Sequence, residues 1–243
     1  MVGKKRSGLA NDRRAYGCGR CYTPCIPVAI DIGSIATNDG EGTYTLNGNY
    51  TITACQILNI PVGTTLQIIG VKTLTNSGTI NNSGTLYISS GIIQNNGTIN
   101  NSGSITNQAG STFNNKTGGI INNSNQTSND GTFNNSGTIQ NNTGGIFYNT
   151  DFFNNNTGGI VYNYNTGTIR NSNDTGGGRI NNNAGGFIYT YGGGALYNDD
   201  GATINNNVGG TISTSNGGAC GAGSFVDNGN INNSGTINTS CPP

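Results

Sequence analysis

The sequence predicts an all-β protein, a single-stranded parallel β-helix (β-solenoid) with three sides and about 18–24 residues per coil. The first observation is that single apolar residues recur at near-constant steps through a polar chain. Between Arg179 and Cys220 the step is 8 residues, with apolar positions at Ile180, Ile188, Leu196, Ile204 and Ile212. The second observation is that the same unit recurs upstream with a step of 6, at Leu74, Ile80 and Leu86. One apolar residue per unit is too little for a free strand to bury, so we expect successive units to stack around a shared core.

Composition agrees with a stacked β fold. The 243 residues include 42 glycines and 44 asparagines, while only 8% of residues are charged and 32% are apolar. Low charge combined with regular apolar spacing argues against charge-driven disorder. The unit lacks the i, i+3, i+4 apolar stripe of a helix, and glycine and asparagine are poor helix formers.

Residues 1–30 form a separate N-terminal arm, which is basic. Residues 1–25 have a net charge of +5, and the remainder of the chain has a net charge of −5. The basic residues of the arm are Lys4, Lys5, Arg6, Arg13, Arg14 and Arg20. We expect the arm either to dock on an acidic partner, such as another copy, a polyanion or nucleic acid, or to be a solvated tail. No apolar run typical of a secretory signal follows the basic residues, and no stretch is long enough to span a membrane, so we expect cytoplasmic synthesis.

The chain has six cysteines and no histidine. Cys18, Cys21 and Cys25 lie close together, whereas Cys55, Cys220 and Cys241 are scattered. A zinc site would need a fourth ligand at a recognisable spacing, so we predict no metal site. The six cysteines are candidates for disulfides whose pairing the sequence leaves open, or they stay reduced.

The next two segments are interpreted as an N-terminal cap with the first coil, residues 31–73, and the solenoid with its C-terminal cap, residues 74–243. A cap is needed because open strand edges would template aggregation. Within a unit such as Thr79-Ile80-Asn81, the threonine and asparagine point away from the buried isoleucine. Glycine and asparagine at the corners tolerate left-handed backbone, and stacked corner asparagines are expected to form amide ladders. We favour right-handed winding because steps of 6 and 8 suit variable corners.

Little in the sequence supports catalysis. The only glutamate is Glu41, and the aspartates are dispersed, so we predict no catalytic residue, no cofactor and no enzymatic activity.

Exposed aromatic residues are the better candidate site. If Ile188 points inward, its neighbours point outward. The candidate contact surface, between protomers or for sugar rings, comprises Tyr162, Tyr164, Phe187, Tyr189, Tyr191 and Tyr197. The alternative is that these are scattered rim residues.

The passage from Ile60 to Leu86, with its "KTLTNSGTINNSGTL" string, resembles the β-helix repeats of bacterial filamentous adhesins. It is also similar to the Asn-rich β-helix proteins of giant DNA viruses of amoebae. The resemblance covers roughly residues 43–240. The adhesins carry a secretion signal, from which this chain departs, whereas the viral group builds virion layers.

The viral resemblance implies a non-enzymatic structural rod that self-assembles, as a trimer with lateral packing, into a virion coat, tegument or fibre layer. The alternative is a cell-surface spike or adhesin that binds carbohydrate through the aromatic patch.

Overall fold

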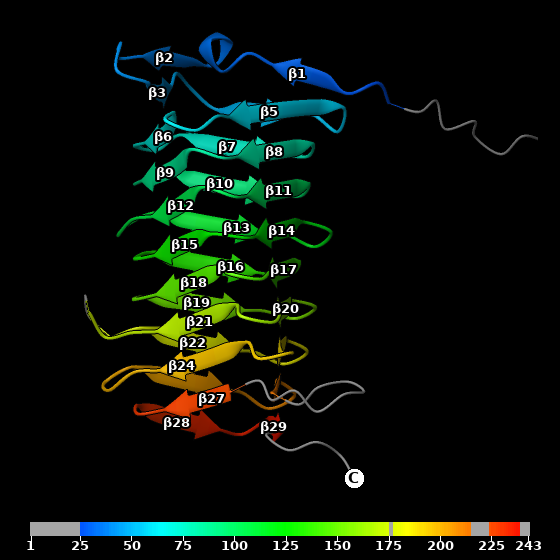
Figure 1. Ribbon diagram of the computed structural model, residues 1–243, viewed down its shortest axis with the longest axis vertical. Helices are drawn as coiled ribbons and strands as arrows, with labels where there is room; N and C mark the ends of the chain where they lie inside the picture. Colours follow the sequence, from blue (N-terminus) through cyan, green and yellow to red (C-terminus); the bar gives the residue numbers. More distant parts are fainter. Residues whose placement is uncertain (1–24, 175–176, 215–223, 239–243) are drawn as a thin grey trace, which may run out of the picture.

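The computed structural model describes residues 25–174, 177–214 and 224–238, and it is a parallel β-solenoid of about eight coils. Its coils stack along one axis, with β1 and β2 at one end and β28 and β29 at the other (Figure 1). The predicted fold class, the three sides and the coil length are confirmed. Handedness stays a prediction.

Three sheets form the sides, and the chain visits them in turn. Sheet 1 has ten strands, in the order β1 (Val28–Ile30), β5 (Gln56–Ile60), β8 (Thr79–Asn82), β11 (Thr98–Asn101), β14 (Ile120–Asn123), β17 (Thr138–Asn141), β20 (Ile160–Asn163), β23 (Phe187–Thr190), β26 (Thr211–Ser213) and β29 (Thr236–Asn238). Sheet 2 has ten strands, in the order β2 (Ala36–Asn38), β3 (Thr43–Leu46), β6 (Thr65–Ile69), β9 (Thr85–Ser89), β12 (Ser104–Asn107), β15 (Gln126–Asn129), β18 (Ile146–Asn149), β21 (Thr168–Asn171), β24 (Ala195–Asn198) and β27 (Ser224–Asp227). Sheet 3 has nine strands, in the order β4 (Tyr50–Ile52), β7 (Thr73–Asn76), β10 (Ile92–Asn95), β13 (Thr112–Asn115), β16 (Thr132–Asn135), β19 (Phe152–Asn155), β22 (Arg179–Asn182), β25 (Thr203–Asn206) and β28 (Asn230–Asn233).

Most strands have four residues, of which the second and fourth point inward. In β8, Ile80 and Asn82 are buried, whereas Thr79 and Asn81 are half-buried on the outside. The alternation follows from the strand period of two. The second positions supply the apolar core that the spacing predicted. Except for Thr127 in β15, the second residues of the strands from Leu74 to Ile212 lie in one hydrophobic cluster.

Phenylalanines fill the middle of this core. Phe113, Phe133 and Phe153 occupy the same column in adjacent coils of sheet 3. The rings of Phe113 and Phe133 stack with centroids 4.5 Å apart, and Phe147 from sheet 2 meets Phe133 edge-on at 5.3 Å. Aromatic packing therefore joins two of the three sides.

The fourth positions form three buried asparagine ladders. In sheet 3 the ladder runs from Asn76 to Asn233, and in each rung Nδ2 donates to the Oδ1 of the next coil at 2.7–2.9 Å. Sheets 1 and 2 carry equivalent ladders that start at Asn82 and Asn107. Most of these amides also donate to a backbone carbonyl, as Asn76 does to Thr98. The predicted ladders are confirmed. They can line the interior because most of the amide groups find hydrogen-bond partners there, the exceptions among the described residues being Asn82 Oδ1 and Asn107 Oδ1 at the first rungs.

The corners between strands use glycine in two ways. In short corners such as Ser102-Gly103, a Cβ on Gly103 would overlap the carbonyl oxygen of Gly84 in the preceding coil. In longer corners an additional glycine adopts positive φ, as Gly118 does at 85°. The first kind permits close stacking of coils, and the second supplies the turn.

The N-terminal end departs from the parallel pattern. β2 and β3 pair antiparallel, and the 3₁₀ helix η1 (Ile32–Ser34) precedes them. Cys25 and Cys55 form a disulfide, which joins the segment before β1 to the corner before β5. β2 is the last strand of sheet 2 at this end, and its antiparallel pairing with β3 ends the parallel pattern there.

Candidate functional site

The outer face of sheet 1 carries the candidate site. Two rows of side chains run along the rod axis there. The first row holds outward residues in register on successive strands, the fourth of β5 and the third of each later strand: Asn59, Asn81, Asn100, Asn122, Gln140, Tyr162 and Tyr189. The second row holds the residue just after each strand: Ser83, Ser102, Ser124, Asn142, Tyr164 and Tyr191. Each of these corner residues donates its backbone N–H to the preceding coil, so the row is held in register.

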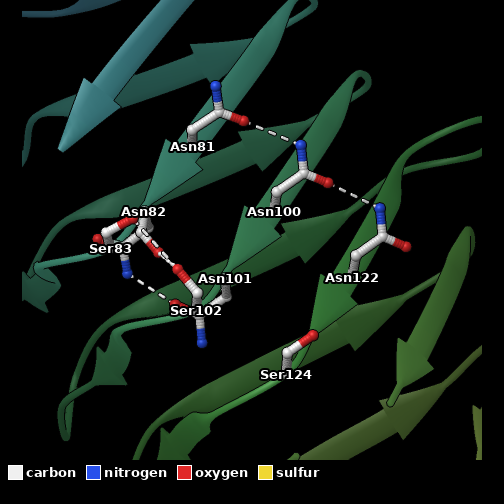
Figure 2. Close-up of a pocket in the computed structure, with 8 residues that line it drawn as sticks. All are labelled: Asn81, Asn82, Ser83, Asn100, Asn101, Ser102, Asn122 and Ser124. Atoms are coloured by element: carbon white, nitrogen blue, oxygen red, sulfur yellow. Dashed lines mark hydrogen bonds between the residues drawn. The ribbon is translucent and has the colours of Figure 1, made fainter. Parts of the chain in front are cut away.

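At the N-terminal part of these rows lies a polar groove with a volume of about 290 Å³. Figure 2 shows Asn81, Asn100 and Asn122 as an outer ladder along one side, with the serines on the other. The Asn100 Nδ2 donates to Asn81 Oδ1 at 2.9 Å, and Asn122 donates to Asn100 at 2.8 Å. We call this feature the Asn–Ser groove, lined by Asn81, Asn82, Ser83, Asn100, Asn101, Ser102, Asn122 and Ser124. Sequence analysis missed it, although counting strands in threes would have placed these asparagines in one row.

Further along, four tyrosines of the same rows and Phe187, the first residue of β23, form a cluster that we call the Tyr platform: Tyr162, Tyr164, Phe187, Tyr189 and Tyr191. The Tyr162 ring lies 5.6 Å from Tyr164 and 5.7 Å from Tyr189, measured between centroids. Tyr191 lies 5.8 Å from Tyr164 and 5.9 Å from Tyr189. The ring planes in these four pairs are within 25° of parallel. Five of the six predicted aromatic residues therefore gather on two adjacent strands and their corners.

Packing within the platform alters the phenols. Burial raises the pKa of Tyr164, Tyr189 and Tyr191 above its ordinary value, and repulsion from neighbouring phenolates adds to the effect. The hydroxyls of Tyr164, Tyr189 and Tyr191 are therefore protonated at neutral pH and can donate and accept hydrogen bonds. The site offers aromatic surface with neutral polar groups.

Tyr197 does not belong to the platform. It lies on β24 in sheet 2, beside Arg170 of the neighbouring strand β21. Arg170 Nε pairs with Asp199 Oδ2 at 2.6 Å, and these residues line a hollow with Thr168 and Tyr197. The grouping of Tyr197 with the other aromatics was wrong, because it comes one strand after Tyr189, which places it on the next side of the coil.

Several predicted residues lie outside the described part of the chain. These are the arm residues Lys4, Lys5, Arg6, Arg13, Arg14 and Arg20, and the cysteines Cys18, Cys21, Cys220 and Cys241. Of the six cysteines, Cys25 and Cys55 are described, as the disulfide above.

The described carboxylates are spread along the rod. Asp39 accepts hydrogen bonds from the backbone of Glu41 and Thr43, which hold the pKa of Asp39 below its ordinary value. Burial raises the pKa of Asp151. Within residues 25–174, 177–214 and 224–238, no three metal-binding side chains come together. None of the helices in this part of the chain is long and apolar enough to cross a membrane.

Comparison with known proteins adds a distant likeness. No family model and no curated protein matches the sequence. A crystal structure of a TibA fragment, hyper-glycosylated by TibC, aligns over 81% of this chain and 92% of that chain, at 19% identity and a TM-score of 0.30. At this TM-score the alignment carries no argument about the fold or the function of this chain.

Proposed function

We propose that the chain is a non-enzymatic structural protein, a β-solenoid rod whose copies pack side by side into a layer or fibre of a virion coat or tegument. The supporting observation is an outer asparagine ladder on sheet 3. Its six amides are joined Nδ2 to Oδ1 at 2.7–2.9 Å: Asn114, Asn134, Asn154, Asn181, Asn205 and Asn232.

The ladder supports self-assembly through its spacing. Strands in a sheet repeat at about 4.8 Å, and a second copy of this chain has the same repeat. Identical side chains stacked at this repeat form tight interfaces in cross-β assemblies. Thr132 and Thr203 lie on the same face as the ladder, and Phe152 and Arg179 lie between them in the same row, where the guanidinium of Arg179 packs over the Phe152 ring.

We further propose that copies associate as trimers that pack laterally. The opposite charges of the arm and the body favour docking of the basic arm of one copy on the acidic body of another. Synthesis in a host cytoplasm and incorporation into a virion accord with such a rod, and a place at the cell surface is the alternative.

The experiment places charges on the packing face without breaking the ladder. Sedimentation velocity compares the wild type with Thr132→Lys plus Thr203→Lys on sheet 3, over a range of concentrations. The control, Thr85→Lys plus Thr168→Lys, makes the same change at the same strand position on sheet 2. Wild type and control should sediment as oligomers, and the sheet 3 variant as a monomer. A monomeric wild type, or equal loss in both variants, would contradict the proposal.

A second candidate function is carbohydrate binding by a surface spike or adhesin. The Tyr platform favours it, since five aromatic rings gathered on one side of a rod are typical of a recognition surface.

A further inference from the structure

The outward residues of the Asn–Ser groove and the four tyrosines of the Tyr platform occupy the same two rows of sheet 1, and Phe187 lies beside Tyr189 on β23. Asn122 precedes Gln140, Gln140 precedes Tyr162, and Tyr162 precedes Tyr189 in consecutive register. Between the groove and the platform, the two rows contain Gln140 and Asn142. The groove and the platform are therefore parts of one continuous strip along the rod.

We propose that this strip binds an extended, neutral polysaccharide whose chain lies along the rod axis. The inference gives the carbohydrate-binding candidate a defined site and ligand class. It is independent of the assembly proposal, because the packing face lies on sheet 3.

Charge argues for a neutral ligand. Among the described residues, the two rows from Asn59 to Tyr191 contain only asparagine, glutamine, serine and tyrosine. An anionic polymer would find no lysine or arginine in these rows, and a cationic one would find no carboxylate. Amide and hydroxyl groups donate and accept hydrogen bonds, as sugar hydroxyls do.

Length argues for an extended ligand. From Asn81 to Tyr189 the first row takes five steps between strands, or about 24 Å at the usual strand spacing. A single sugar ring can contact the groove or the platform, whereas a chain of several rings contacts both. We expect affinity to rise with the length of the chain until the strip is filled.

The aromatic end of the strip suits the C–H face of a sugar ring, and the polar end suits its hydroxyl groups. The C–H face of a sugar ring packs on an aromatic ring, and its hydroxyl rim needs polar partners. The platform supplies near-parallel rings, and the groove supplies exposed Ser83, Ser102 and Asn100. A second copy of sheet 1 suits the strip less well, since two facing grooves lined by amides and hydroxyls would enclose unfilled polar space.

The first test is an array of linear glycans, neutral and acidic, short and long, probed with the full chain. We expect binding to long neutral glycans and little binding to disaccharides or acidic glycans. The chain has no tryptophan, so the fluorescence of its 11 tyrosines, four of which lie in the platform, can be followed during titration with the bound glycan. Absence of binding to every neutral glycan would overturn the proposal.

Variants then locate the site. Tyr162→Ala plus Tyr189→Ala should weaken binding roughly tenfold or more, and Ser83→Glu plus Ser102→Glu should weaken it through the groove. The control is Tyr87→Ala plus Tyr197→Ala, at the same strand position on sheet 2, and it should bind as the wild type does. Equal loss in both tyrosine pairs, or no effect of the groove variant, would overturn the inference.

The same titrations on the Thr132→Lys plus Thr203→Lys background separate the two proposals. If this variant binds glycan, the proposal that the strip on sheet 1 is a polysaccharide site is supported, even when the rods do not assemble. If the Tyr162 and Tyr189 substitutions instead lower the mass of the wild-type assembly without changing glycan binding, the platform contacts a second copy and the inference fails.

Discussion

The asparagine side chain performs two different tasks in this chain, and neighbours in sequence show the difference. Asn135 lies inside the rod, where its Nδ2 donates to Asn155 Oδ1 at 2.9 Å. Asn134 lies outside and donates to Asn114 Oδ1 at 2.9 Å, in the opposite direction along the axis. Each hydrogen bond contributes only about 0.5–1.5 kcal/mol net, but a buried amide left without partners costs more.

The first prediction uses this pair. Asn135→Asp replaces a buried donor with a carboxylate that faces Asn155 Oδ1, so we expect a loss of about 3 kcal/mol or more in the free energy of unfolding at neutral pH. Asn134→Asp should cost about 1 kcal/mol, because water reaches the outer carboxylate. Urea unfolding followed by circular dichroism measures both, and equal losses would contradict the buried role.

The pH dependence of the Asn135→Asp variant has a definite sign. Burial favours the neutral acid, so the pKa of the new carboxyl in the folded state lies above its unfolded value of about 3.9. The stability deficit should therefore be smallest near pH 4 and grow as the pH rises through the folded pKa. A deficit independent of pH would mean that the carboxylate escapes to solvent.

The ends of the ladders show where the repeat begins. Asn82 Oδ1 and Asn107 Oδ1 have no hydrogen-bond partner among the described residues. In each case the residue one coil earlier is an isoleucine, Ile60 or Ile88, instead of an asparagine. The first coils are thus held by apolar side chains at both inward positions, and the later coils exchange one of them for an amide.

At the scale of the element, the corner decides how closely two coils approach. Gly103→Ala would push a methyl group into the Gly84 carbonyl, so the coils must separate, and we expect a loss of more than 2 kcal/mol. Gly118→Ala places a methyl group in open space. We expect it to lower the free energy of unfolding by about 1 kcal/mol, because alanine is strained in the left-handed backbone conformation of this position. Thermal unfolding of the two variants checks the order, and the reverse order would show that backbone conformation outweighs stacking at these corners.

The strand positions explain what could be predicted from the sequence. Ile188 was placed inside, and Tyr189 outside, from alternation alone, because both follow from local geometry. Tyr197 was misplaced because its side of the rod depends on counting strands around the coil. The inward orientation of Asn82 could not be predicted from the pattern of polar residues. Its burial depends on a hydrogen-bond acceptor, Asn101 Oδ1, which lies on another coil.

At the scale of the whole molecule, each coil contacts only its neighbours, so stability should vary along the rod. Ile139 and Ile237 occupy the same column of sheet 1, but Ile139 is 1% exposed in the middle of the stack and Ile237 is only partly buried in the last coil. Ile139→Ala should cost about 2–4 kcal/mol and weaken the coils on both sides. Ile237→Ala should cost about 1 kcal/mol or less and loosen the last coil alone.

Hydrogen exchange measured by mass spectrometry distinguishes these outcomes along the chain. Peptides from β14 and β20 should lose protection in the Ile139→Ala variant, whereas in the Ile237→Ala variant the loss should be confined to β26 and β29. Uniform loss along the rod in both variants would mean that the solenoid unfolds as a single unit. Stability would then be a property of the whole stack, and the nearest-neighbour account of the coils would be wrong.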